Sequence, residues 1–255
     1  MNETQGSQPG ALALVGSGEY LSQMDEVDRF LLGTRGGAAG WRVAVIPTAS
    51  GLELGAPERW NAMGVEHFRA LGAEVASVML LGRPDAHDPQ IVDALRGADL
   101  YYFSGGNPEH AIESLRDTPA WDVIRGGYDA GAVLAGCSAG AMMLGGYTLS
   151  IRSVMRGQPP QWVPALGLLP GLVTMPHFDR MADFAGEELF RAILASAPAD
   201  ATLIGVDEDT ALVRLPGDPT AAPRWQVMGR QTVSVFEHGG RRAIYHPGEV
   251  VPLPG

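Results

Sequence analysis

One stretch of the chain carries a serine in the setting of a nucleophile. Ser138 has a glycine two positions before it and another two positions after it, at Gly136 and Gly140. The apolar run 132–135 precedes this stretch and the helix-compatible run 141–144 follows it, which predicts a sharp turn from a strand into a helix. Such a turn strains its central residue, and small neighbours relieve the crowding. Hydrolases with a serine nucleophile expose its hydroxyl on a turn of this kind. The alternative is a structural turn without chemistry.

A loop with two adjacent glycines could complete such a site. Residues 103–108 read Phe-Ser-Gly-Gly-Asn-Pro and follow an apolar run that is typical of a buried strand. Ligand sites collect at the carboxyl ends of parallel strands, and glycines let the backbone approach a ligand closely. The N–H groups of Gly106 and Ala139 could then form an oxyanion hole. Loops of this composition also occur without a catalytic role.

A serine hydroxyl needs a positioned base, which is usually a histidine. His177 follows the apolar run 172–175 after one proline, at the carboxyl end of another predicted strand and on the same sheet edge as Ser138. The other five histidines lie in a predicted helix, in loops or at edges, where solvated or packing roles are typical. We therefore expect His177 to be the base.

The acid that would hold the imidazole is less well defined. Glu208 follows an apolar run and so also lies at a strand end, but it has an acid on either side. Asp207 and Asp179 therefore stay open as alternatives to Glu208. In an esterase of the α/β-hydrolase type the acid precedes the histidine, and Asp207 or Glu208 would pair with His238 or His246.

Short apolar runs alternate with amphipathic segments, which predicts a three-layer α/β sandwich with a mostly parallel central sheet. Strands are predicted at 11–15, 42–47, 74–80, 99–103, 132–136, 172–175 and 202–206. Helices are predicted at 57–71 and 181–197, and we assign their aromatic residues, such as Phe68 and Phe184, to the core. Antiparallel strands that end the sheet are predicted at 210–215, 225–228, 232–237 and 242–245.

The composition argues against several classes of function. The formal net charge is -11, so a phosphate backbone would be repelled and we expect no nucleic-acid partner. The chain has no lysine, which excludes a Schiff-base, phosphate-loop or kinase lysine. Its histidines are scattered and lack the i, i+4 pair of a zinc hydrolase. We expect neither a metal nor another cofactor.

Cysteine usage and apolar runs indicate the compartment. No apolar run reaches the roughly 20 residues of a membrane span, and the single cysteine, Cys137, fits a reducing compartment. We therefore expect a cytoplasmic protein without a membrane partner.

We expect residues 1–10 to form a flexible tail and residues 11–255 to form a single catalytic domain. An apolar antiparallel edge at the C-terminus could pair two copies into a homodimer.

Four stretches together resemble a known peptidase family. They are 103–107, 136–141, 176–178 with Arg180, and 205–212, the last of which reads Gly-Val-Asp-Glu-Asp-Thr-Ala-Leu. In this order they resemble the family of dipeptidase E and cyanophycinase, whose fold is similar to that of class I glutamine amidotransferases. The resemblance implies one role for each candidate: nucleophile Ser138, base His177, acid Glu208, and oxyanion donors Gly106 and Ala139.

The resemblance also implies a class of substrate. The family acts on N-terminal aspartyl dipeptides and on cyanophycin, a branched polymer of aspartate and arginine. Cyanophycinases typically carry an arginine-rich stretch after the histidine, whereas Asp183, Glu187 and Glu188 follow Arg180 here. We therefore expect a small peptide with an acidic residue. The candidate substrate-binding residues are Asn107 and Arg180, whose guanidinium can bind a carboxylate through two hydrogen bonds.

Cys137 is the other conceivable nucleophile, because the amidotransferase relatives use cysteine. Adjacent strand residues point to opposite sides, so Cys137 faces the core if Ser138 faces the cleft. Two other functions stay open besides a serine peptidase. One is the esterase described above, and the other is a catalytically inert binding protein that keeps the fold.

Overall fold

The computed structural model describes residues 8–34, 40–217, 222–236 and 241–253. Its helices are α1 (Asp25–Gly33), α2 (Ala56–Ala70), α3 (Pro89–Leu95), α4 (Pro108–Leu115), α5 (Pro119–Asp129), α6 (Ala139–Met142), α7 (Ile151–Met155), α8 (Met181–Ala185) and α9 (Glu187–Ala195). Short 3-10 helices are η1 (Ser22–Met24), η2 (Thr48–Ser50), η3 (Asp85–His87) and η4 (Phe178–Arg180).

The strands form three sheets. They are β1 (Leu12–Val15), β2 (Arg42–Ile46), β3 (Glu74–Ser77), β4 (Leu100–Phe103), β5 (Val133–Cys137), β6 (Tyr147–Leu149), β7 (Trp162–Pro164), β8 (Leu172–Met175), β9 (Thr202–Val206), β10 (Thr210–Arg214), β11 (Trp225–Gly229), β12 (Val233–Phe236), β13 (Arg242–Tyr245) and β14 (Val250–Val251). Residues 1–7 of the expected tail lie outside the described residues. Gly10 is buried, and its N–H donates to the carbonyl of Tyr128 (3.0 Å).

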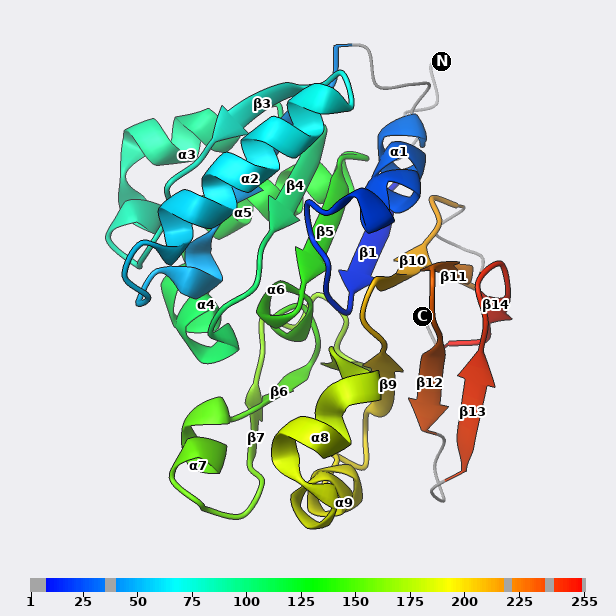
Figure 1. The fold of residues 1–255 in the computed structure, drawn as a ribbon. Coiled ribbons are helices and arrows are strands. Elements are labelled where there is room, and N and C mark those ends of the chain that lie inside the picture. Colours follow the sequence, from blue (N-terminus) through cyan, green and yellow to red (C-terminus); the bar gives the residue numbers. More distant parts are fainter. Residues whose placement is uncertain (1–7, 35–39, 218–221, 237–240, 254–255) are drawn as a thin grey trace, which may run out of the picture.

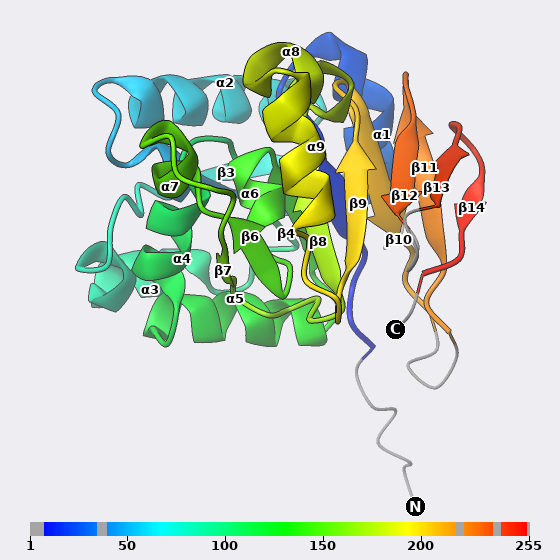
Figure 2. The same cartoon turned by 90° about the horizontal axis from the view of Figure 1, so that it is seen from below.

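The main sheet has eight strands in the order β14-β11-β10-β1-β5-β4-β2-β3. The five strands from β1 to β3 in this order are mutually parallel, and β10, β11 and β14 extend the sheet in antiparallel pairing. Helices α1 and α2 cover one face, and α3, α4 and α5 cover the other (Figures 1 and 2). The predicted α/β fold with a mostly parallel central sheet is therefore confirmed.

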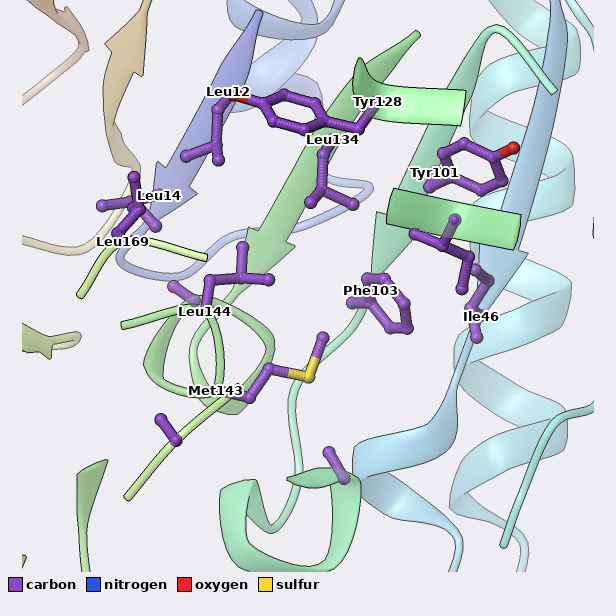
Figure 3. Packing of buried hydrophobic residues seen from close by; sticks show 14 of the residues in the cluster. Leu12, Leu14, Ile46, Tyr101, Phe103, Tyr128, Leu134, Met143, Leu144 and Leu169 are labelled. Carbon is purple, nitrogen blue, oxygen red and sulfur yellow. The ribbon is translucent and has the colours of Figure 1, made fainter. Parts of the chain in front are cut away.

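Buried side chains alternate between the two faces of the main sheet because strand residues point to opposite sides in turn. In β1, Ala13 and Val15 pack toward α1 and α2, whereas Leu12 and Leu14 pack toward the other helix layer. Figure 3 shows the centre of that second cluster, where Leu134 of β5 lies between residues of β1 and β4. The two cores hold the parallel strands in place, and with them the loops at their carboxyl ends.

The structure corrects the prediction of a single sheet. Strands β8 and β9 do not join the main sheet but form a second sheet in the order β13-β12-β9-β8. Of the predicted antiparallel ending, only β10 and β11 extend the main sheet, because the chain returns to the second sheet at residues 230–232, between β11 and β12. Apolar runs mark buried strands, but they do not specify which strand lies alongside.

Two predicted elements differ from the observed ones by more than one or two residues. The predicted helix 181–197 is divided into α8 and α9 at Gly186, whose φ of 78° and ψ of 150° are not helical. Phe184 was assigned to the core on the basis of one continuous helix, but it is 67% exposed. The predicted strand 74–80 ends at Ser77, which pairs with Val45, and the chain then turns, with the N–H of Leu80 donating to the carbonyl of Val78 (2.9 Å).

Candidate active site

Ser138 lies at the turn between β5 and α6, at the carboxyl edge of the main sheet (Figure 1). Its φ of 52° and ψ of -115° are rare for a residue with a side chain. A Cβ on Gly136 would lie 2.2 Å from the carbonyl oxygen of Gly140. A Cβ on Gly140 would lie 2.7 Å from the carbonyl oxygen of Phe103. The turn therefore requires glycine on both sides of the serine.

This packing predicts that Gly136→Ala lowers the free energy of unfolding by about 1–3 kcal/mol, because the added carbon meets backbone that cannot move aside. Gly126→Ala is the matched control, since a Cβ at Gly126 in α5 meets nothing within 4 Å. We expect this control to gain about 0.5–1 kcal/mol. Urea unfolding measures both, and equal stabilities for the two variants would contradict the prediction.

His177 reaches Ser138 from the second sheet. It follows β8 after Pro176, and its φ of 49° and ψ of 37° are left-handed. The imidazole Nε2 lies 3.1 Å from Ser138 Oγ. The serine and the histidine are therefore brought together, although β8 and β5 belong to different sheets rather than to one shared sheet edge.

Glu208 lies on the other side of the imidazole, where the chain passes from β9 to β10. Its Oε1 lies 2.8 Å from Nδ1 of His177. A carboxylate at Nδ1 favours a proton on that nitrogen, and Nε2 is then free to accept the proton of a serine hydroxyl. The three side chains thus form a continuous series of hydrogen-bonding contacts.

The two alternative acids have other contacts. Asp179 Oδ1 accepts the backbone N–H of Glu208 at 2.8 Å, so it supports the segment that carries Glu208. Asp207 is buried, and its Oδ2 accepts both the N–H and the hydroxyl of Thr232 at 3.0 and 2.5 Å. Of these three acids, it is Glu208 that contacts the imidazole.

The site is open to solvent on one side. The side chains of His177 and Glu208 are 31% and 33% exposed, and Ser138 is half-buried. The exposed ring of Phe184 lies 6.2 Å from the imidazole, edge to face. An apolar side chain beside the imidazole can limit access of water from that direction, and it offers a surface for a bound molecule.

The double-glycine loop lies beside Ser138. A Cβ on Gly105 would lie 3.3 Å from Ser138 Cβ and 3.7 Å from its Oγ. The N–H groups of Gly106 and Ala139 donate to no acceptor within the described ranges. Two amides without an internal partner next to a serine hydroxyl are available for an oxygen of a ligand.

The predicted substrate-binding residues differ in their contacts. Asn107 caps α4, because its Oδ1 accepts the N–H of His110 at 3.1 Å. Arg180 is exposed and forms no ion pair with any residue that the structure describes. Its guanidinium is therefore available to a ligand carboxylate, whereas part of the hydrogen-bonding capacity of Asn107 is used within the fold.

The remaining predictions concern two histidines near the C-terminus, metal ligands and membrane-spanning helices. His246 is exposed, and its backbone N–H and carbonyl form hydrogen bonds with Glu249, while His238 lies outside the described residues. No cluster of three or more potential metal ligands occurs in the described part of the chain. Within the same ranges, no helix is long and apolar enough to cross a membrane.

Comparison with known proteins assigns this geometry to a family. The model of peptidase family S51 matches residues 12–218, which include Ser138, His177 and Glu208. The chain belongs to peptidase family S51. The family predicted from the serine turn and the downstream acidic stretch is therefore confirmed.

Two proteins similar to this chain bear peptidase names, and a more distant structure shares its fold. Peptidase E of Shewanella amazonensis is 31% identical over 149 residues, which cover 56% of this chain and 61% of that protein. The crystal structure of a peptidase from an acI-B1 actinobacterium superposes with a TM-score of 0.86 at 33% identity, over 98% of this chain and 99% of that one. A peptidase E candidate from Listeria monocytogenes EGD-e shares the fold, with a TM-score of 0.58 at 19% identity, over 88% and 100% of the two chains.

Beside the serine turn lies one buried acid that sequence reasoning does not find. Glu19 is 6% exposed and accepts hydrogen bonds from Gly105 and Cys137. Its place in the sequence offers one signal: it follows β1, which pairs in parallel with β5, so its loop lies at the edge that carries Ser138. That signal does not specify where its side chain points.

Proposed function

We propose that this S51 chain is a serine peptidase in which Ser138 is the nucleophile, His177 the general base and Glu208 the acid. The observation that carries the proposal is the series of contacts from Ser138 Oγ to His177 Nε2 at 3.1 Å and from His177 Nδ1 to Glu208 Oε1 at 2.8 Å. The first distance is short enough for proton transfer from Ser138 to His177, and the second is short enough for a hydrogen bond that orients the imidazole. Neither contact requires the side chains to move.

In the proposed reaction, Ser138 Oγ attacks the peptide carbonyl while His177 Nε2 takes the hydroxyl proton. Glu208 stabilises the imidazolium that results. The N–H groups of Gly106 and Ala139 donate to the oxyanion of the tetrahedral intermediate. The imidazolium then gives its proton to the leaving amine, and water activated by His177 hydrolyses the acyl-enzyme.

The substrate that fits best is a short peptide with an acidic residue. This proposal draws on the peptidase E relative and on Arg180, which is exposed three positions after His177 and has no internal ion-pair partner among the described residues. Charge-assisted hydrogen bonds to a guanidinium are among the strongest polar contacts in proteins. An aspartyl side chain of the substrate would supply the carboxylate.

The test compares the hydrolysis of Asp-Leu and Leu-Leu dipeptides by the wild type and by Arg180→Ala. We expect the wild type to prefer Asp-Leu. We expect Arg180→Ala to raise KM for Asp-Leu by about 10-fold or more, because a hydrogen bond to a charged group contributes about 1.5–3 kcal/mol. Arg96→Ala is the control, since Arg96 precedes β4 and therefore lies at the opposite edge of the sheet. Equal rates for both dipeptides would refute the acidic preference, and failure of a fluorophosphonate to label Ser138 would refute the hydrolase.

A further inference from the structure

Glu19 is a buried carboxylate directly behind the proposed nucleophile. Its Oε1 accepts the N–H of Gly105 at 2.9 Å, and its Oε2 accepts the thiol of Cys137 at 2.9 Å. Burial of a carboxylate is costly unless its oxygens find donors, and here each oxygen has one. The reaction described above assigns no task to this side chain.

Both partners of Glu19 adjoin the proposed oxyanion donors. Gly105 immediately precedes Gly106, and Cys137 stands two residues before Ala139. A Cβ on Gly105 would lie 3.2 Å from Glu19 Oε1, so the carboxylate packs closely against the loop. One side chain therefore connects the two separate segments that carry these amides.

We propose that Glu19 is a positioning residue that sets the separation between the N–H groups of Gly106 and Ala139. This inference rests on the proposed function and adds a residue to it. An oxyanion hole lowers the barrier only if its donors already stand where the negative charge develops. Glycines at 105 and 106 leave that loop without side chains to hold it, and Gly106 has a φ of 143°.

The loop is anchored on both sides of its exposed part. Asn107 N–H donates to the carbonyl of Ala49 at 2.7 Å, and Glu19 holds Gly105 on the other side. The backbone of Ala49 packs directly against Gly106. A Cβ on Gly106 would lie 2.3 Å from the carbonyl carbon of Ala49. Loss of Glu19 would therefore free the end of the loop that faces Ser138.

The thiol of Cys137 is suited to donate to Glu19. Burial, followed by the neighbouring charge of Glu19, raises the pKa of Cys137 well above its usual value. The thiol therefore keeps its proton at neutral pH and donates it to Oε2. Cys137 is fully buried, so it serves the turn as a hydrogen-bond donor and not as a nucleophile.

The experiment compares Glu19→Ala and Glu19→Gln with a matched control. Glu109 is also buried, at 8% exposed, and like Glu19 it accepts one side-chain donor and one backbone N–H, here the hydroxyl of Ser150 at 3.1 Å and the N–H of Arg152 at 3.0 Å. Three quantities are measured on folded protein: kcat and KM for Asp-Leu, the affinity for a peptide aldehyde that forms a tetrahedral adduct with serine, and the rate at which a fluorophosphonate labels Ser138.

We expect Glu19→Ala to lower kcat about 10–100-fold. This loss does not exceed the loss that is typical when an oxyanion donor itself is removed. Aldehyde affinity and labelling rate fall by the same factor, while KM changes less than about 3-fold. Glu19→Gln recovers most of the activity, because its amide oxygen still accepts from Gly105. Glu109→Ala lowers the melting temperature and keeps kcat within about 2-fold of the wild type. If Glu19→Ala does not fold, Glu19→Asp replaces it, since its shorter side chain cannot reach both partners.

Three outcomes would overturn the proposal. They are a kcat for Glu19→Ala within about 3-fold of the wild type, a rise in KM alone, and an equal loss of labelling rate in Glu109→Ala. If the wild type cleaves no peptide but is labelled at Ser138, the peptidase function fails, and the labelling rates still test Glu19. If Ser138 is not labelled at all, both proposals fail.

Discussion

Replacement of Ser138 by alanine is expected to lower kcat/KM for peptide hydrolysis by at least about 10⁴-fold and to leave the fold intact. The hydroxyl is the group that would form the acyl-enzyme, and His177 Nε2 stands 3.1 Å from it. Stability should change by less than about 1 kcal/mol, because alanine also has a Cβ and meets the same strain at a φ of 52°.

Steady-state kinetics and thermal unfolding of Ser138→Ala test this prediction together. Ser196→Ala is the matched control, because it removes a hydroxyl at the end of α9 that donates to the carbonyl of Ile193 (3.0 Å). We expect that control to retain at least half of the activity. If Ser138→Ala folded normally and retained more than about 1% of kcat/KM, Ser138 could not be the nucleophile.

The second large effect is expected at Glu208. Glu208→Gln should lower kcat about 10³- to 10⁴-fold, because a neutral amide neither stabilises the imidazolium nor favours the Nδ1–H tautomer. Its side chain keeps nearly the same size and half-buried position, so the fold should be retained.

Asp179→Asn and Asp207→Asn serve as comparisons for Glu208→Gln. Asparagine at 179 can still accept the N–H of Glu208 through its amide oxygen, and we expect kcat within about 5-fold of the wild type. Asp207 accepts two hydrogen bonds from Thr232, which hold the backbone between β11 and β12. Its substitution should therefore reduce thermal stability more than kcat. A larger loss of kcat in either comparison variant than in Glu208→Gln would show that the acid is misassigned.

The serine turn could be predicted from the sequence because its cause is local. Gly136 and Gly140 flank Ser138 within five residues, and a Cβ at either glycine would meet backbone of the turn or of β4. The family assignment rests on the same stretch together with the downstream acids, and the family model confirms it. Most strands of the main sheet and helix α2 were predictable for a similar reason, since apolar runs and helical spacing are local patterns, whereas α1, α3, α4 and α5 were not predicted.

The partners of those elements were not predictable. His177 was expected at the edge of one shared sheet, but β8 pairs with β9 in a second sheet, whose strands β9, β12 and β13 lie below β10 and β11 in Figure 1. Phe184 was expected in the core, but Gly186 ends its helix early and leaves the ring exposed beside the imidazole. The first difference arises from pairing between strands far apart in the chain, whereas the second arises locally, from a glycine two positions after Phe184.

The sequence by itself determined the fold class, the family, the serine turn and the positions of most strands of the main sheet. Only the tertiary structure decided that Glu208 rather than Asp179 or Asp207 contacts His177, and that Glu19 lies beneath the turn. The reason is that backbone periodicity and glycine spacing act over a few residues, whereas the direction of a side chain in a loop depends on which distant segment supplies its hydrogen-bond partner.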